Sequence, residues 1–177
     1  MMKRLVAFAV FMVVFSAAFQ VGSMYEHTPE EAQNLMDEFM ETIRGIDGVG
    51  IFVHNTVLAL PMFLPGVGAA WGVLAGWSTG FTLAAITTLN PEVGATPALA
   101  LLYLSPFGIM ELTAYSLAGS RSVMLAVRMV RRQSIWRDAK HLVIEVGIVV
   151  GLLLAGGLIE YSMIEMAREA GLTIPEL

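Results

Sequence analysis

The most regular feature of this chain is the alternation of long apolar runs with short charged stretches. A helix that crosses a membrane needs about 20 apolar residues, because the hydrocarbon core is about 30 Å thick and each residue rises about 1.5 Å. The pattern therefore predicts an all-α, polytopic helical membrane protein, with a single integral membrane domain over residues 1–177. We expect about five transmembrane helices, at residues 5–22, 49–64, 66–89, 97–119 and 142–161.

The composition supports lipid as the main solvent of this chain. Hydrophobic residues make up 56% of it and charged residues 14%, whereas soluble domains are about a quarter charged. The mean hydropathy is +0.72. The chain has no cysteine, which excludes disulfides and thiolate metal sites.

The positions of the charges predict the orientation of the helices. Lys3 and Arg4 precede the first apolar run, and six cations against one acid occupy residues 120–141. Acidic residues dominate the segment after the first run and the end of the chain. Because cytoplasmic loops are rich in Lys and Arg, and an odd number of spans separates the two kinds of loop, we expect the N-terminus inside and the C-terminus outside.

The first apolar run has an alternative interpretation as a cleavable signal peptide. It has a basic start, an apolar middle, and small residues at Ser16 and Ala18 in the spacing that signal peptidase prefers. The run is long for such a signal, however, and Phe19 and Gln20 follow where cleavage would fall. A transmembrane helix is the favoured interpretation.

Two segments outside the spans have helical patterns. Residues 28–44 carry a capping box, with Thr28 as cap, Pro29 at the first position and Glu31 three residues on. This predicts an acidic external amphipathic helix whose apolar stripe covers the outer end of the bundle, with partner binding as the alternative. The second segment is residues 120–141, a basic cytoplasmic segment. Its cations are candidates for contact with anionic lipid, although topology alone explains its charge; they are Arg128, Arg131 and Arg132.

Two spans carry small residues at every fourth position, which lets helix backbones approach closely in lipid. These predict tight helix contacts, either within this chain or with another one. The first span lacks such a row of small residues at every fourth position, so we expect it at the periphery. The candidate packing residues are Gly68, Gly72, Gly76 and Gly80 in the third span, and Gly147 and Gly151 in the fifth.

Several polar groups and a helix break lie at membrane depth. Glu111 is well inside the fourth span, and a charged side chain there must face protein or water because exposure to lipid costs several kcal/mol. Pro106 and Gly108 predict that this helix is broken, with Ser105 capping its second part. We therefore predict an intramembrane polar site formed by Glu111, Asn55, His54, Pro106 and Gly108. The alternative is that Glu111 merely bonds to Asn55 or His54 and holds the helices in register.

Two stretches resemble a known family of prokaryotic membrane proteins. They are IFVHNTVLALPMFLPGVGAAWG, residues 51–72, and SPFGIMELTAYSLAG, residues 105–119. Both resemble the stage II sporulation protein M family. The resemblance rests on Pro106, Gly108, Glu111, Leu112 and Ala114, while Phe107 replaces the histidine of the family pattern. The family member of spore-forming bacteria resembles a scaffold that anchors peptidoglycan-degrading partners, and many other members have no assigned role. The resemblance therefore implies a scaffold role for this chain.

The absence of catalytic patterns shapes the functional expectation. The chain has no metalloprotease HExxH helix, no nucleophile elbow and no phosphate-binding loop. We expect a non-enzymatic membrane scaffold that needs no cofactor or metal. Its partners would be membrane lipids and either membrane proteins or further copies of itself, with no nucleic acid. The expected location is the cell membrane of a bacterium or archaeon. The alternative function is a small transporter or channel that uses Glu111 as its site.

Overall fold

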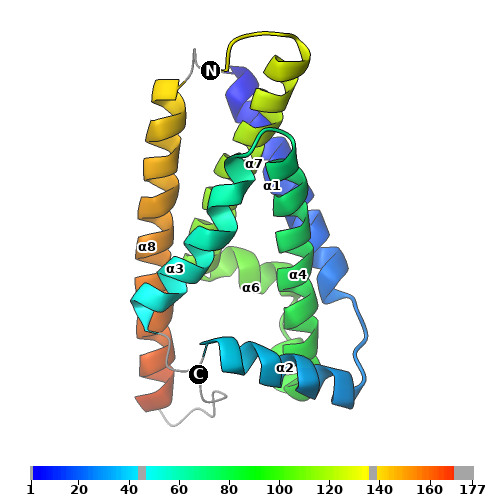
Figure 1. Cartoon of the computed structure of the whole chain (residues 1–177). Helices are drawn as coiled ribbons and strands as arrows, with labels where there is room; N and C mark the ends of the chain where they lie inside the picture. Colours follow the sequence, from blue (N-terminus) through cyan, green and yellow to red (C-terminus); the bar gives the residue numbers. More distant parts are fainter. Residues whose placement is uncertain (1, 44–46, 136–138, 170–177) are drawn as a thin grey trace.

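The computed structural model describes residues 2–43, 47–135 and 139–169, and within these ranges it contains helices and no strand. Figure 1 shows the long helices running between the two ends of the molecule. The elements are α1 (Met2–Ser23), α2 (Pro29–Ile43), α3 (Gly48–Ala59), the 3-10 helix η1 (Leu60–Phe63), α4 (Val67–Leu89), α5 (Pro91–Gly94), α6 (Ala98–Leu104), α7 (Pro106–Val130) and α8 (Ala139–Glu169).

The lengths and composition of these helices confirm an all-α polytopic membrane protein. Three of the described helices are long and apolar enough to cross a membrane: α1, α4 and residues 139–166 of α8. The pair α6 and α7 makes a fourth if it counts as one broken span. Helix α3 with η1 is apolar but shorter. The five crossings and their inside–outside direction therefore stay predictions.

The predicted fourth span is broken where the sequence indicated, but it ends elsewhere. Helices α6 and α7 meet at an angle of 89°, with Ser105 as N-cap and Pro106 as the first residue of α7. Helix α7 does not stop near Gly119 but continues to Val130. Part of the segment expected to be a separate basic region, residues 120–130, therefore belongs to this helix.

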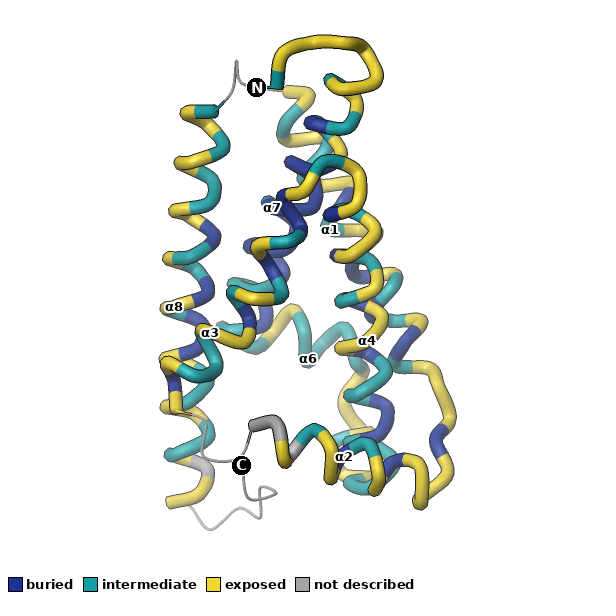
Figure 2. Tube along the Cα trace, in the orientation of Figure 1, coloured by how far each residue is buried: buried dark blue, intermediate teal, exposed yellow. Residues whose placement is uncertain are grey.

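Helix α7 lies at the centre of the bundle. It contacts α1, α3, α4, α6 and α8, and its side chains at Leu112, Ala114 and Ala118 have no exposed area. Figure 2 shows buried residues following α7 and the neighbouring face of α1, whereas the outer faces of α3 and α8 are exposed. The exposed residues of these outer faces are largely apolar, as lipid-facing surfaces are.

The expectation that α1 lies at the periphery is wrong, because α1 fills the glycine groove of α4. Phe11, Phe15 and Phe19 are each at most 5% exposed. They recur every fourth residue and lie over three glycines of α4 with the same spacing. The pairs are Phe11 over Gly72, Phe15 over Gly76 and Phe19 over Gly80. A groove of small residues thus receives a row of large ones, and α1 needs few small residues of its own.

Helix α2 lies across the end of the bundle, against α4 (Figure 1). The backbone amide of Thr28 donates to Glu31 Oε2 at 2.9 Å, and the amide of Glu31 donates to Thr28 Oγ1 at 3.3 Å. The hydrogen bonds from Thr28 lower the pKa of the Glu31 carboxyl below its usual value. Ala32 and Met36 are buried, so part of the apolar stripe covers the bundle. The side chains of Met40 and Ile43 lie outside the described ones.

Candidate functional site

One polar cluster joins three helices in the half of the bundle nearest α2. Asn55 of α3 is buried, and its Nδ2 donates to Glu111 Oε1 of α7 at 2.5 Å. A hydrogen bond therefore joins α3 to α7 here, and the carboxylate of Glu160 on α8 interacts electrostatically with that of Glu111. We call these three residues the carboxylate cluster.

The break before α7 explains how Glu111 reaches this position. Ser105 Oγ accepts from the Gly108 amide at 3.2 Å and donates to the Leu101 carbonyl oxygen at 2.8 Å. A Cβ at Gly108 would lie 2.4 Å from Ser105 Oγ and 2.6 Å from the Leu102 carbonyl oxygen, so the turn has no room for a larger residue. Pro106 and Gly108 thus shape the backbone of the break rather than contribute side-chain chemistry.

Two parts of the predicted polar site are different in the structure. His54 is exposed, so grouping it with Glu111 is wrong. Adjacent residues of a helix point about 100° apart, and because Asn55 faces inward, His54 faces out. Glu160 was missed, since it had been counted among the acidic residues at the C-terminal end. Its place inside an apolar helical run that continues to Glu169 was the available signal.

A second polar cluster lies toward the other end of the bundle and is built around Glu145 of α8. Arg121 of α7 donates to Glu145 through Nε at 2.6 Å and through Nη2 at 2.5 Å. Arg4 of α1 donates from Nε to Glu145 Oε1 at 2.8 Å. Arg4 also donates to Ser120 Oγ and to the Leu117 carbonyl oxygen. We call Arg4, Arg121 and Glu145 the arginine cluster.

The arginine cluster changes the meaning of two residues used for topology. The charge pattern predicts that Arg4, before the first span, and Arg121, in residues 120–141, lie in cytoplasmic segments. In the structure the side chain of Arg121 is only 5% exposed and that of Arg4 is 19% exposed. Paired hydrogen bonds between arginine and carboxylate are among the strongest in proteins. The cluster therefore ties α1 and α8 to the central helix α7.

The two sets of candidate packing glycines have different surroundings. All four glycines of α4 are buried, and a Cβ at Gly80 would lie 2.0 Å from the Phe19 carbonyl oxygen. Gly147 and Gly151 of α8 are exposed, and no described atom lies within 4 Å of a Cβ built at either of them. On α8 it is Gly157 that lies close to another helix, because a Cβ built there would be 3.0 Å from the Gly48 carbonyl oxygen of α3.

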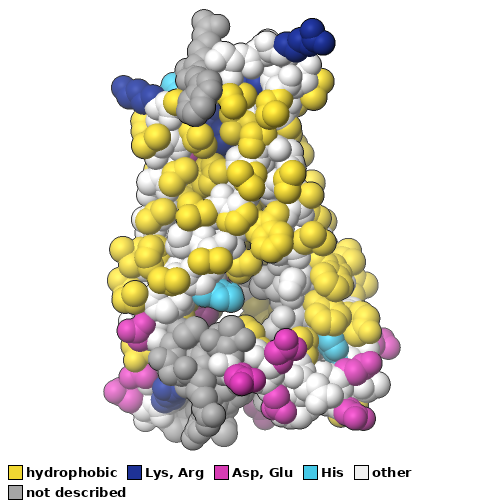
Figure 3. Space-filling model, in the orientation of Figure 1, with side chains coloured by type: hydrophobic (Ala, Val, Ile, Leu, Met, Phe, Trp, Pro, Cys, Tyr) yellow, Lys and Arg dark blue, Asp and Glu magenta, His cyan; other side chains and the backbone are white. Residues whose placement is uncertain are grey.

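The cations proposed for lipid contact lie at the end of α7. Arg128 is in its last turn and partly buried, whereas Arg131 and Arg132 are exposed beyond it. Figure 3 shows Lys and Arg side chains at that end of the molecule and most Asp and Glu side chains at the opposite end. Within the described ranges, no three His, Cys, Asp or Glu side chains are grouped so that they could hold a metal ion.

The fold and its two interhelical polar clusters define a polytopic, all-α integral membrane protein. A comparison with protein-family models matches residues 5–161 to the model described as Stage II sporulation protein M. The match covers most of the 177-residue chain, and the protein belongs to this family. Neither the search of curated proteins nor the search of solved structures found a match.

Proposed function

We propose that this protein is a non-enzymatic scaffold in the cell membrane of a bacterium or archaeon, where it assembles partner proteins. The observation that carries the proposal is the exposed glycine face of α8. The glycines of α4 are all used in packing within the chain, but Gly147 and Gly151 contact nothing described. Exposed small residues four apart are the pattern that membrane helices use to bind one another.

The surroundings of Gly147 and Gly151 suit a helical partner. Leu154 and Leu158 continue the same face of α8, and both are exposed. Because lipid gives apolar helices little drive to associate, close backbone approach decides which faces pair. A flat strip of glycine flanked by leucine allows this approach. The partner is a transmembrane helix of another protein or of a second copy.

The absence of cysteine from the chain gives a direct test. A single cysteine at Gly151 should crosslink to a second copy or to a co-purifying membrane protein when native membranes are oxidised. The matched control is Val13→Cys, at an exposed position in the middle of α1. Adding Gly147→Leu to the first variant should reduce its crosslinking several-fold, because the leucine prevents close approach. Equal crosslinking from both cysteines would contradict the proposal.

The carboxylate cluster supports a second candidate function, a small transporter or channel for protons or monovalent cations. Ionisable side chains buried among membrane helices are commonly parts of ion pathways, and broken helices often build such sites. Here Glu111 follows a break with an 89° bend and is bonded to Asn55. Glu160 supplies the second carboxylate.

Flux measurements on reconstituted protein test this candidate. If it is correct, proteoliposomes should conduct protons or sodium faster than protein-free liposomes, and Glu111→Gln should remove at least about nine-tenths of the difference. Glu92→Gln is the control, because Glu92 is an exposed acid on α5. Flux that is no faster than in empty liposomes, or equal loss in both variants, would remove the candidate.

A further inference from the structure

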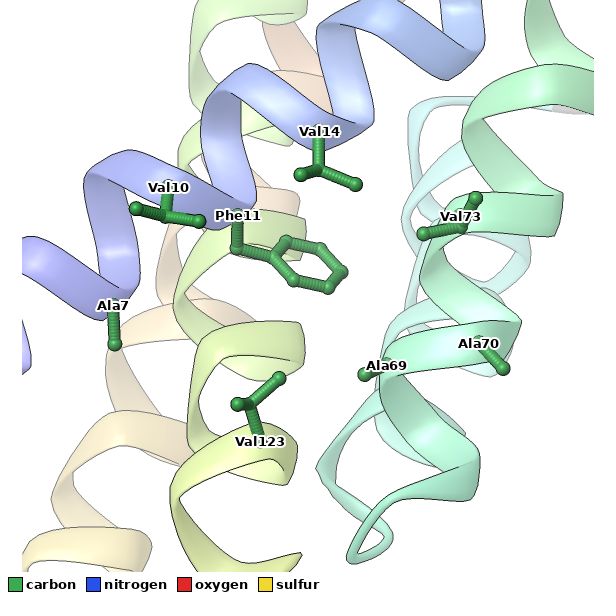
Figure 4. A pocket seen from close by; sticks show the side chains of 8 residues that line it. All are labelled: Ala7, Val10, Phe11, Val14, Ala69, Ala70, Val73 and Val123. Carbon is green, nitrogen blue, oxygen red and sulfur yellow. The ribbon is translucent and has the colours of Figure 1, made fainter. Parts of the chain in front are cut away.

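An apolar groove opens on the surface between α1, α4 and α7. Its volume is about 300 Å³. Val10 and Val14 of α1, Ala70 and Val73 of α4, and Val123 of α7 line it around the ring of Phe11 (Figure 4). Its lining side chains are all alanine, valine or phenylalanine.

The packing of Phe11 explains why the groove exists. The Phe11 ring lies in the space that side chains would occupy at two glycines, 2.8 Å from a Cβ at Gly72 and 2.1 Å from one at Gly119. The ring is therefore drawn deep between the three helices. The short side chains of Ala69 and Ala70, near the start of α4, do not refill the space outside it. The result is a slot whose inner end is closed by an aromatic ring.

Cations lie at the end of the molecule toward which the groove runs. Lys3 is exposed and one turn before Ala7, a lining residue, so both lie on the same side of α1. Arg131 is exposed at the end of α7, two steps of four residues beyond Val123. The acids of α2, α5 and the end of α8 lie at the opposite end (Figures 1 and 3). The carboxylate of Glu145, in the arginine cluster, is bonded to Arg4 and Arg121, so its negative charge is already paired.

We propose that this groove binds one acyl chain of an anionic phospholipid, whose phosphate headgroup is held by Lys3 and Arg131. A helix with its side chains is about 10 Å across, so a groove of about 300 Å³ is too small for one. A single hydrocarbon chain fits its narrow, apolar shape. The cations at the membrane surface then select a negatively charged headgroup over a neutral one.

Native mass spectrometry of the full chain tests both halves of the proposal. The protein is reconstituted in vesicles with equal amounts of dioleoyl phosphatidylglycerol and dioleoyl phosphatidylcholine, which share their acyl chains, and is then extracted in mild detergent. We expect one phosphatidylglycerol to be retained at least about fivefold more often than phosphatidylcholine. Lys3→Gln combined with Arg131→Gln should remove that preference while leaving a lipid bound. Equal retention of the two lipids by the unaltered protein would overturn the proposal.

Filling the groove tests the acyl-chain half separately. Ala70→Phe should reduce lipid retention at least about fivefold, and because Ala70 is exposed, the helix can carry the larger side chain. The matched control is Leu74→Phe, at an exposed position of α4 that does not line the groove. Helical content and thermal midpoint from circular dichroism establish that both variants fold. Unchanged retention in a folded Ala70→Phe variant would overturn the proposal. The proposal would also be overturned if the Ala70→Phe variant kept its lipid but no longer bound a second copy of the protein, because the groove would then be a protein interface.

Discussion

Replacing Gly80 with leucine is expected to prevent α1 from packing on α4 and to abolish the folded membrane domain. A Cβ at Gly80 would lie 2.0 Å from the Phe19 carbonyl oxygen and 2.9 Å from the Ser23 amide nitrogen. Both atoms belong to the backbone of α1, so a change of side-chain rotamer cannot relieve the clash. Overpacking a core costs about 1–3 kcal/mol when side chains can adjust. Because a whole helix must move here, we expect a loss above that range.

The measurement compares Gly80→Leu with Gly151→Leu in the same detergent. Trp77 lies one turn before Gly80, and its ring stacks on that of Phe81 at a centroid distance of 5.0 Å. Tryptophan fluorescence therefore reports on this region. Gly151→Leu should keep the fluorescence and the thermal midpoint of the unaltered protein, because nothing described lies near that position. A folded Gly80→Leu variant whose midpoint equals that of Gly151→Leu would contradict the close approach of α1 and α4.

This contrast also shows what a small-residue pattern can predict. Glycine at every fourth position indicates that a helix has a surface shaped for close approach. In the structure the four glycines of α4, from Gly68 to Gly80, are buried against neighbouring elements. The pattern does not name the partner, since a groove can receive either another groove or a row of large side chains. The phenylalanines at positions 11, 15 and 19 were visible in the sequence. They had the spacing of the glycines but were not matched with them.

Local signals in the sequence predicted the local structure well. Ser105-Pro106 specified a helix start because serine can cap and proline suits the first position, and α7 begins there. The capping box at Thr28 did the same for α2. Such signals involve neighbours in the chain, so they need no knowledge of the fold. They did not reveal that α7 continues beyond Gly119 to Val130.

Contacts between distant residues were predicted less well, because they depend on how helices rotate about their axes. Asn55 and Glu111 share a cluster, but His54 points outward and Glu160 takes part instead. Likewise, a loop arginine and a buried one look alike in sequence. The cations that follow Arg121 in the sequence favour a loop position for it. In the structure Arg121 is buried, and its neighbours Ser120 and Ser122 have no exposed area and form hydrogen bonds within the bundle.

Replacing Glu145 with alanine is expected to destabilise the domain by about 3–5 kcal/mol, the usual cost of removing one partner from a buried ion pair. Arg121 would lose two hydrogen bonds to the carboxylate, and Arg4 would lose one. The side chain of Arg121 is 5% exposed, so water cannot readily replace them. The loss should also be nearly independent of salt, because buried pairs are screened little.

A double substitution separates the lost ion pair from the charge left behind. If the main cost is an uncompensated buried arginine, Arg121→Met combined with Glu145→Leu should recover much of the stability that Glu145→Ala loses, since apolar residues of similar size can replace a buried pair. Denaturation midpoints in one detergent, at low and high salt, measure both variants. Arg168→Met is the control, because its contact with Glu165 is exposed and should contribute less than about 1 kcal/mol. A Glu145→Ala loss as small as that of the control would show that the arginine cluster does not hold α1, α7 and α8 together.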